Sequence, residues 1–153
     1  MDGVTLETKI DDEISPRLAK LAKRVGDLSP ALDEIGASNV TETQHRFETE
    51  SDPKGNKWKP LAALTLKGRK GSNPRILRKD SHLYDSITHV VDSGGRTVRV
   101  GSNKKQARIH QLGGMAGRGR KVEIPARPYL GISDAGRKEI VEIITDHIEG
   151  GAR

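Results

Sequence analysis

The sequence predicts an α+β fold in which helices cover one face of a small antiparallel sheet. Apolar residues recur at helical spacing toward both ends of the 153-residue chain, and a glycine turn separates two alternating segments in its middle. Glycine-rich basic stretches interrupt these patterns. A chain of this length forms about one domain, so we expect residues 1–153 to fold as a single unit.

The composition limits both the core and the classes of function. Only 33% of the residues are hydrophobic and 3% are aromatic, so we expect a monomer of marginal stability. The absence of cysteine excludes disulfides, thiolate nucleophiles and cysteine-ligated zinc. With 27 basic and 21 acidic residues, the formal net charge of +6 is equally consistent with nucleic-acid contact, an acidic protein partner or ordinary solubility.

The N-terminal residues predict a strand followed by a helix. Residues 4–10 alternate apolar and polar side chains, which is typical of a half-buried strand. The helix that follows tolerates Pro16 in its first turn. Its apolar stripe consists of Ile14, Leu18, Leu21, Ala22, Val25 and Leu28. Acidic residues at the start and the lack of a long apolar run predict a soluble, cytosolic protein without membrane contact.

Two more long helices are predicted. Ser29 followed by Pro30 is a helix-start signal, with Ser29 as the N-cap, and this helix should run to about Glu48. Its apolar stripe is Leu32, Ile35, Gly36, Val40, Thr43 and Phe47. Near the C-terminus, Ser133 should cap a helix that ends at Gly150 and Gly151. The stripe of that helix is Ile140, Val141, Ile144 and Ile148.

A central hairpin is the clearest strand signal. Residues 87–92 and 96–101 flank the turn Ser93-Gly94-Gly95, whose glycines supply the positive backbone angles that tight turns need. A short helix over residues 104–112 should end at Gly113 and Gly114. A strand over residues 122–125 then leads into an extended segment, because Pro128 restricts the residue before it.

Two basic, glycine-containing segments are predicted to be mobile loops, at about residues 67–79 and 115–121. Their cations could bind nucleic acid without sequence preference, by releasing counterions. The few aromatic residues are not spaced as a base-stacking platform, however, so a loop that becomes ordered on protein assembly is the favoured interpretation. The cations concerned are Lys67, Arg69, Lys70, Arg75, Arg78, Lys79, Arg118, Arg120 and Lys121.

Catalytic patterns are missing from the sequence. The five histidines lack the spacing of paired metal ligands, and neither a GxSxG elbow nor a Walker lysine is present. His110 is expected to be a partly buried residue bonded to the backbone, although a hydrolase using His110 with an acid was the third alternative. We therefore expect no enzyme activity, no metal and no cofactor.

Four segments occur in order between about residues 47 and 148. They are GNKWKPLAALTLKGRKG, RILRKDSHLYDSI, VRVGSNKKQARIHQLGG and VEIPARPYLGIS. Together they resemble the virion morphogenesis, or tail-completion, family of Mu-like and related tailed phages and prophages.

The resemblance implies a structural protein of the virion, assembled in the bacterial host cytoplasm. It would complete the tail and join it to the head as a ring, hexameric by expectation, in contact with tail tube and head-tail connector proteins. A basic nucleic-acid-binding module is the alternative function. Loops can remain unstructured until a partner orders them, and closing rings need two different complementary surfaces on each subunit.

The motif residues divide into an interface group and a scaffold group. Arg127 should pair with an acid of the fold, in the last helix, or else stand exposed at a rim, and Trp58 should serve as a core residue or an interface anchor. The interface candidates are Trp58, Lys67, Arg69, Lys70, Arg75, Arg78, Arg118, Arg120, Lys121, Arg127 and Tyr129. The scaffold candidates are Gly55, Pro60, His110, Gln111, Gly113, Gly114, Pro125 and Pro128.

Overall fold

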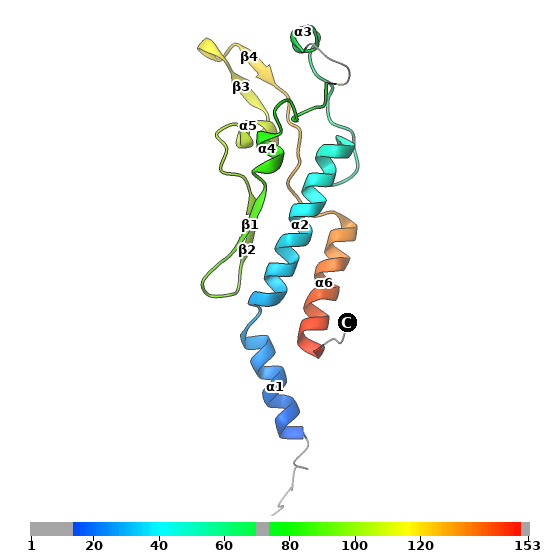
Figure 1. The fold of residues 1–153 in the computed structure, drawn as a ribbon, viewed down its shortest axis with the longest axis vertical. Coiled ribbons are helices and arrows are strands. Elements are labelled where there is room, and N and C mark those ends of the chain that lie inside the picture. Colours follow the sequence, from blue (N-terminus) through cyan, green and yellow to red (C-terminus); the bar gives the residue numbers. More distant parts are fainter. Residues whose placement is uncertain (1–13, 70–73, 151–153) are drawn as a thin grey trace, which may run out of the picture.

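The computed structural model describes residues 14–69 and 74–150 and confirms the α+β class (Figure 1). The strand predicted for residues 4–10 lies outside the described residues, as do Lys70 and Gly151. The elements are α1 (Ile14–Gly26), α2 (Ser29–Thr49), α3 (Ala63–Gly68), α4 (His82–Asp85), β1 (Thr88–Val91), β2 (Val98–Gly101), α5 (Ala107–Leu112), β3 (Gly114–Ala116), the 3-10 turn η1 (Arg118–Arg120), β4 (Val122–Ile124) and α6 (Asp134–Glu149).

Helix α2 is the centre of the arrangement, with the β1–β2 hairpin and α6 packed against it (Figure 1). It begins at Ser29 as predicted, but Ser29 is not the N-cap. The carboxylate of Asp27 instead accepts a hydrogen bond from the backbone N–H of Ser29, at 3.1 Å. The predicted cap of α6 is confirmed, because the Ser133 hydroxyl accepts from the backbone N–H of Gly136 at 2.9 Å.

The central hairpin is confirmed with antiparallel pairing of Val90 with Arg99 and of His89 with Val100. Its turn is closed by the carboxylate of Asp92, which accepts from the backbone N–H groups of Arg96 and Thr97. Where the hairpin crosses α2, a side chain at Gly36 would collide with the ring of His89. Gly36 therefore lets strand and helix approach closely.

Segment 115–121, expected to be a mobile loop, is instead the tip of a second hairpin. Strands β3 and β4 pair Met115 with Glu123 and Ala116 with Val122, and the basic residues form the turn η1 between them. The expectation of one sheet is corrected to two two-stranded sheets among the described residues. The strand predicted at residues 122–125 is confirmed as β4, whereas its partner β3, with only three residues, was too short for alternation to reveal it.

The first predicted loop also contains fixed structure on both sides of the four undescribed residues 70–73. Helix α3 includes Lys67, and Ile76 is buried in the core. The backbone N–H of Ile76 donates to the carboxylate of Glu50 at 2.8 Å. One apolar side chain within a basic stretch was therefore enough to anchor the segment after the gap.

Two separate clusters form the core. The larger joins Phe47, Trp58, Ile76, Leu83, Ile87, Ala107 and Tyr129, at the end of α2 where the short elements gather. The smaller contains only Ala31, Ile35 and Ile143, between α2 and α6. The two clusters divide the molecule into a well-packed end and a thin helical end.

The predicted stripe of α1 is not buried in the subunit. Leu21 is 40% exposed and Val25 is 52% exposed, and Ala22 is exposed as well. The main packing partner of α1 is the C-terminal part of α6, where the ring of His147 bonds the carbonyls of Arg24 and of the following Asp27 at 3.1 and 2.8 Å. The rest of the helix extends beyond the body of the molecule (Figure 1).

Candidate functional site

The motif segments meet around a cluster that contains all four aromatic residues of the chain. The ring of Phe47 lies at its centre, 5.5 Å from the ring of Trp58, 5.9 Å from that of Tyr84 and 5.1 Å from that of Tyr129. The first two contacts are edge-to-face, a favourable geometry for aromatic pairs. The aromatic residues form a core and do not present a surface on which bases could stack.

Gln111 ties the IHQ segment to the PYL segment through three hydrogen bonds. Its side-chain oxygen accepts from the backbone N–H groups of Tyr129 and Leu130, at 3.0 and 2.9 Å. Its side-chain nitrogen donates to the carbonyl of Leu130 at 3.1 Å. A side-chain amide has both a donor and an acceptor, so it can replace a strand partner for this extended segment.

Tyr129 is buried and is anchored through its hydroxyl. Burial raises the pKa of its hydroxyl to about 12, so the group remains protonated. It donates to the carbonyl of Ala107 at 2.8 Å, which fixes the start of α5. The indole N–H of Trp58 donates in the same way to the carbonyl of Pro128, at 2.8 Å.

Gly113 occupies a position that no other residue would tolerate. Its φ is +74°, and a Cβ there would lie 2.8 Å from the backbone nitrogen of Ala126 and 3.0 Å from the carbonyl oxygen of Ile124. Two chain segments therefore pass each other here without room for a side chain. Gly55, with a φ of +86°, similarly permits the turn before Trp58.

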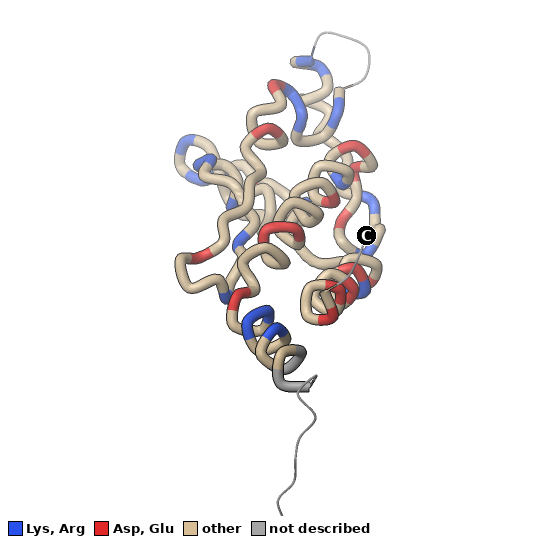
Figure 2. Tube along the Cα trace, turned by 60° about the horizontal axis from the view of Figure 1, so that its bottom comes forward, with Lys and Arg blue, Asp and Glu red and all other residues tan. Residues whose placement is uncertain are grey.

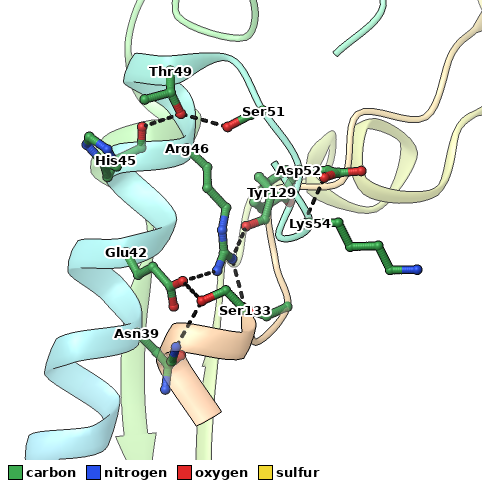
Figure 3. Close-up of polar contacts among 12 residues, drawn as sticks. Asn39, Glu42, His45, Arg46, Thr49, Ser51, Asp52, Lys54, Tyr129 and Ser133 are labelled. Carbon is green, nitrogen blue, oxygen red and sulfur yellow. Dashed lines mark hydrogen bonds and ion pairs between the residues drawn. The ribbon is translucent and has the colours of Figure 1, made fainter. Parts of the chain in front are cut away.

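Two buried arginines hold the extended segment 126–131 from opposite sides. Arg46 of α2 donates to the carbonyls of Tyr129 and Gly131, at 2.9 and 2.8 Å, and pairs with Glu42 at 2.8 Å (Figure 3). Glu42 also accepts a hydrogen bond from the hydroxyl of Ser133, which caps α6. The cap, the arginine and the carboxylate thus form one network.

Arg127 does not pair with an acid, contrary to expectation. Its guanidinium donates to the carbonyls of Lys59 and Pro60, at 2.8 and 2.9 Å. The Arg127 side chain thereby joins the segment that contains Tyr129 to the backbone that follows Trp58. A planar fork of donors can bind two neighbouring carbonyls, which explains why a charged residue is buried here without a carboxylate.

Three interface candidates consequently belong to the scaffold. Trp58, Arg127 and Tyr129 are each less than 9% exposed, and their polar groups are used within the subunit. Arg78 is also engaged, since its guanidinium lies 4.4 Å from the centre of the Tyr84 ring. Sequence motifs of this kind mark a shared interior and give no information about which surface meets a partner.

The other described candidates are brought together at one end of the molecule, opposite α1. Helix α3 and the β3–β4 hairpin both lie there (Figure 1), although they are about fifty residues apart in the chain. Arg69 is partly covered and donates to the carbonyl of Arg75 at 2.7 Å. The exposed cations of this basic end are Lys67, Arg75, Arg118, Arg120 and Lys121.

The basic end also exposes large apolar side chains. Leu64 of α3 is 82% exposed, and Leu66, Leu112, Met115 and Val122 lie on the surface as well. An exposed group of apolar residues surrounded by charges is typical of a protein-protein contact. Neither the basic stretches nor helical periodicity had predicted these residues as a group.

A groove of about 670 Å³ runs between the segment after Trp58, the segment before α4, α5 and β4. His110 lines it, with one ring nitrogen buried and lacking a hydrogen-bond partner among the described residues. Burial, and secondarily the charge of Arg127, lowers the pKa of His110 below its usual value. The expected bond from the His110 ring to backbone is therefore not found for this nitrogen among the described residues, although the main-chain carbonyl of His110 accepts from the N–H of Arg127 at 2.8 Å.

The groove does not contain a catalytic arrangement within the described part of the chain. No hydrogen bond joins the ring of His110 to an acid there, and no group of acidic or histidine residues is placed to hold a metal ion. Within the same residues, no helix is long and apolar enough to cross a membrane.

Arg46 and Glu42 are the functional scaffold residues that the sequence did not reveal. Arg46 lies about one turn after the buried Thr43 on the inner face of α2, a position where the helical period predicts an apolar residue. A charged residue at such a position is a usable signal, because arginine is almost never fully buried without partners. The four aromatic residues are far apart in sequence, so their contact had no local signal.

The ordered motifs, the α+β arrangement and the shared interior define a phage assembly protein. The chain belongs to the phage virion morphogenesis family, whose model matches residues 10–149. It is 33% identical to Mu-like prophage FluMu G protein 2 of Haemophilus influenzae, over 95% of this chain and 96% of that protein. It is also 33% identical to protein G of Escherichia phage Mu, provisionally named as a capsid assembly protein, over 80% of this chain and 89% of the relative. No solved structure matches the chain.

Proposed function

We propose that this morphogenesis protein completes the phage tail and joins it to the head by assembling with copies of itself into a closed ring, of six subunits by expectation. The ring would then contact tail tube proteins on one side and head-tail connector proteins on the other. Assembly would take place in the host cytoplasm, and the protein would remain in the virion. The family supports a structural role in virion assembly, and the finer role is the proposal.

The observation that carries the proposal is uncovered apolar surface at both ends of one subunit. Leu21 and Val25 are exposed on α1, and Leu64 and Met115 are exposed at the basic end. Isolated soluble proteins rarely expose grouped apolar residues, because each large side chain contributes about 1.5–3 kcal/mol when it is buried. Two such surfaces far apart on one subunit support contacts with two different neighbours.

The solution mass of the purified protein, measured by light scattering over a range of protein and salt concentrations, tests self-assembly. We expect a concentration-dependent species near six subunits. Joining of separated heads and tails in extracts tests the role. Protein that neither assembles nor restores joining would contradict the proposal.

Nucleic-acid binding is the second candidate, and the gathering of Lys67, Arg75, Arg118 and Lys121 at one end is the observation that favours it. The exposed leucines and methionine beside these cations favour a protein partner, since nucleic-acid interfaces are more polar. DNA binding that falls steeply with salt, and that is lost when Arg118, Arg120 and Lys121 are changed to glutamine, would support the second candidate. The same variant should leave the oligomer unchanged.

A further inference from the structure

An apolar groove of about 360 Å³ lies open between β2, α2 and α6 at the thin end of the molecule. Val98 and Val100 line one wall and Ile140 and Ile144 line the other. Ile132, at the rim, is 48% exposed. The sheet contributes residues of β2 to this groove and none of β1. The edge of β2 that faces away from β1 therefore borders the groove.

That edge is unpaired. The backbone N–H of Asp92 donates to the carbonyl of Thr97, so alternate residues, Arg99 and Gly101, direct their backbone groups toward β1. The backbone groups of Val98 and Val100 therefore point away from β1. Among the described residues no other backbone hydrogen bond engages them. An unpaired edge beside an apolar groove is a suitable place for an added strand.

The surroundings of the edge are basic. Residues 96–108 contain five basic residues and no acidic one, and all five are exposed: Arg96, Arg99, Lys104, Lys105 and Arg108. A strand with acidic residues on its outer face would therefore be attracted, and one with apolar residues on its inner face would fill the groove.

The chain itself contains a segment of that description. Residues 1–13 carry five acidic residues and one basic residue, and Val4, Leu6 and Ile10 alternate with polar residues. This segment precedes α1 and lies outside the described residues. Its apolar content and its period are complementary to the groove. Within residues 4–10 the charges of Glu7 and Lys9 offset each other, so the acidic complement to the basic edge comes from Asp2 and residues 11–13, which flank the strand.

The groove of the same subunit is too far from this N-terminal segment to receive it as a strand. Helix α1 leads away from the sheet for 13 residues, or about 20 Å, and Val98 contacts α2 at Gly36, about 10 Å beyond Ser29. Ile10 is four residues from Ile14 and reaches about 14 Å at most. Ile10 therefore cannot enter the groove of the same chain, so a strand that places both Leu6 and Ile10 there has to come from another copy.

We propose that residues 4–10 of one subunit add as a strand to the free edge of β2 in a second copy and place Leu6 and Ile10 in its apolar groove. This inference rests on the proposed ring, and it supplies the contact between neighbouring subunits. The donor surface, which is the N-terminal segment, and the acceptor surface, which is the edge of β2, are different and far apart. Each subunit therefore inserts its segment into one neighbour and accepts the segment of another. Such head-to-tail contacts form a ring when the rotation between neighbours closes. Figure 2 shows the basic residues of α1 on the helix that would carry the segment outward.

Cross-linking tests the contact directly, because the chain has no cysteine. We would mix the single variants Leu6→Cys and Ile132→Cys and treat them with a short thiol-reactive cross-linker, which tolerates more separation than a disulfide. A cross-linked dimer of the two variants is expected. The double variant Leu6→Cys/Ile132→Cys should give a ladder of larger multimers, which a two-fold dimer cannot produce.

The control pairs Leu6→Cys with Val90→Cys, an exposed position on β1 outside the groove. Equal cross-linking to both positions, cross-linking within one chain only, or none at either position would overturn the proposal. If the protein fails this test but still joins heads to tails, the proposed function is supported and only the proposed strand contact is wrong.

A charge placed on either face of the segment gives a second, quantitative test. Leu6→Asp should weaken self-association roughly 10- to 100-fold, since it removes a buried leucine. Thr5→Asp adds the same charge on the opposite face of the strand and should change the strength of self-association by only about twofold. Equal effects of the two substitutions would contradict strand addition.

Discussion

The two ends of the molecule reach stability by different means. At the basic end, short elements and extended segments surround the aromatic cluster, and side chains from distant positions bond to backbone groups, as Gln111 and Arg127 do. At the other end, two helices and a hairpin meet over Ala31, Ile35 and Ile143, and α1 leaves Leu21 uncovered. The first end completes its core within one subunit, although Leu64 and Met115 remain exposed on its surface. The second has apolar surface left for neighbours.

The difference shows where motif residues and assembly surfaces lie. The segments that identify the family build the closed end, because extended chain with little regular structure needs specific side-chain partners for its backbone groups. The open end is built from ordinary helical patterns. We expect substitutions at the closed end to unfold the protein and substitutions at the open end to prevent assembly.

The largest effect should come from Trp58→Ala. The change empties a site that is in contact with Phe47 and leaves the carbonyl of Pro128 without its donor. Removing a buried aromatic side chain costs about 3–5 kcal/mol of unfolding free energy. Urea unfolding would measure the loss. Trp58→Phe, which keeps most of the volume, should cost about 1–2 kcal/mol, and a loss below 1 kcal/mol in the alanine variant would show that the cluster is not the main core.

Arg46→Met should be the next most damaging change. It removes the donor for the carbonyls of Tyr129 and Gly131 and leaves Glu42 without its partner. We expect a loss of about 2–3 kcal/mol, since Glu42 keeps some contact with water. The free energy of unfolding of Arg46→Lys, measured in urea, should lie between those of the unsubstituted protein and Arg46→Met. One ammonium group cannot reach all three acceptors that the arginine contacts. Full stability in the methionine variant would rule out this network as a support.

His110 should give the closed end a modest pH dependence. Burial, and then Arg127, lowers the pKa of His110 in the folded protein, whereas the unfolded chain takes up this proton near pH 6.5. Stability is therefore complete above about pH 6.5 and falls as the pH drops from there toward the folded pKa. The free energy of unfolding, measured at several values between pH 5 and 8, should depend less steeply on pH in His110→Gln. Identical slopes would mean that the ring is not buried in solution.

The smallest effect on folding should come from Leu21→Asp at the open end. Leu21 is already exposed, so the free energy of unfolding should change by no more than about 0.5 kcal/mol. Self-association measured by light scattering should nevertheless weaken. Ile35→Asp, on the buried face of α2, is the contrasting variant and should unfold the protein. Equal destabilisation by both would mean that α1 is folded against its own subunit.

Local patterns predicted the elements with strong periodicity. Helix α2 begins at Ser29 and α6 is capped by Ser133, and the hairpin turns at Gly95, because each signal involves residues close together in the chain. The strand predicted at residues 122–125 is β4, but the sequence missed its three-residue partner β3 and the buried Ile76 within a basic stretch. Periodicity identified the apolar stripe of α1 but could not say that the subunit leaves it uncovered.

The sequence by itself determined the class of fold, the family and the residues that the family's motifs bring into the scaffold. Only the tertiary structure decided that Trp58, Arg127 and Tyr129 face inward, that the two basic segments share one end, and that a strand edge beside β2 remains free. Helical and strand periods record contacts a few residues apart. Burial and free edges depend on which distant segments meet, and side-chain patterns along the chain do not encode that pairing locally.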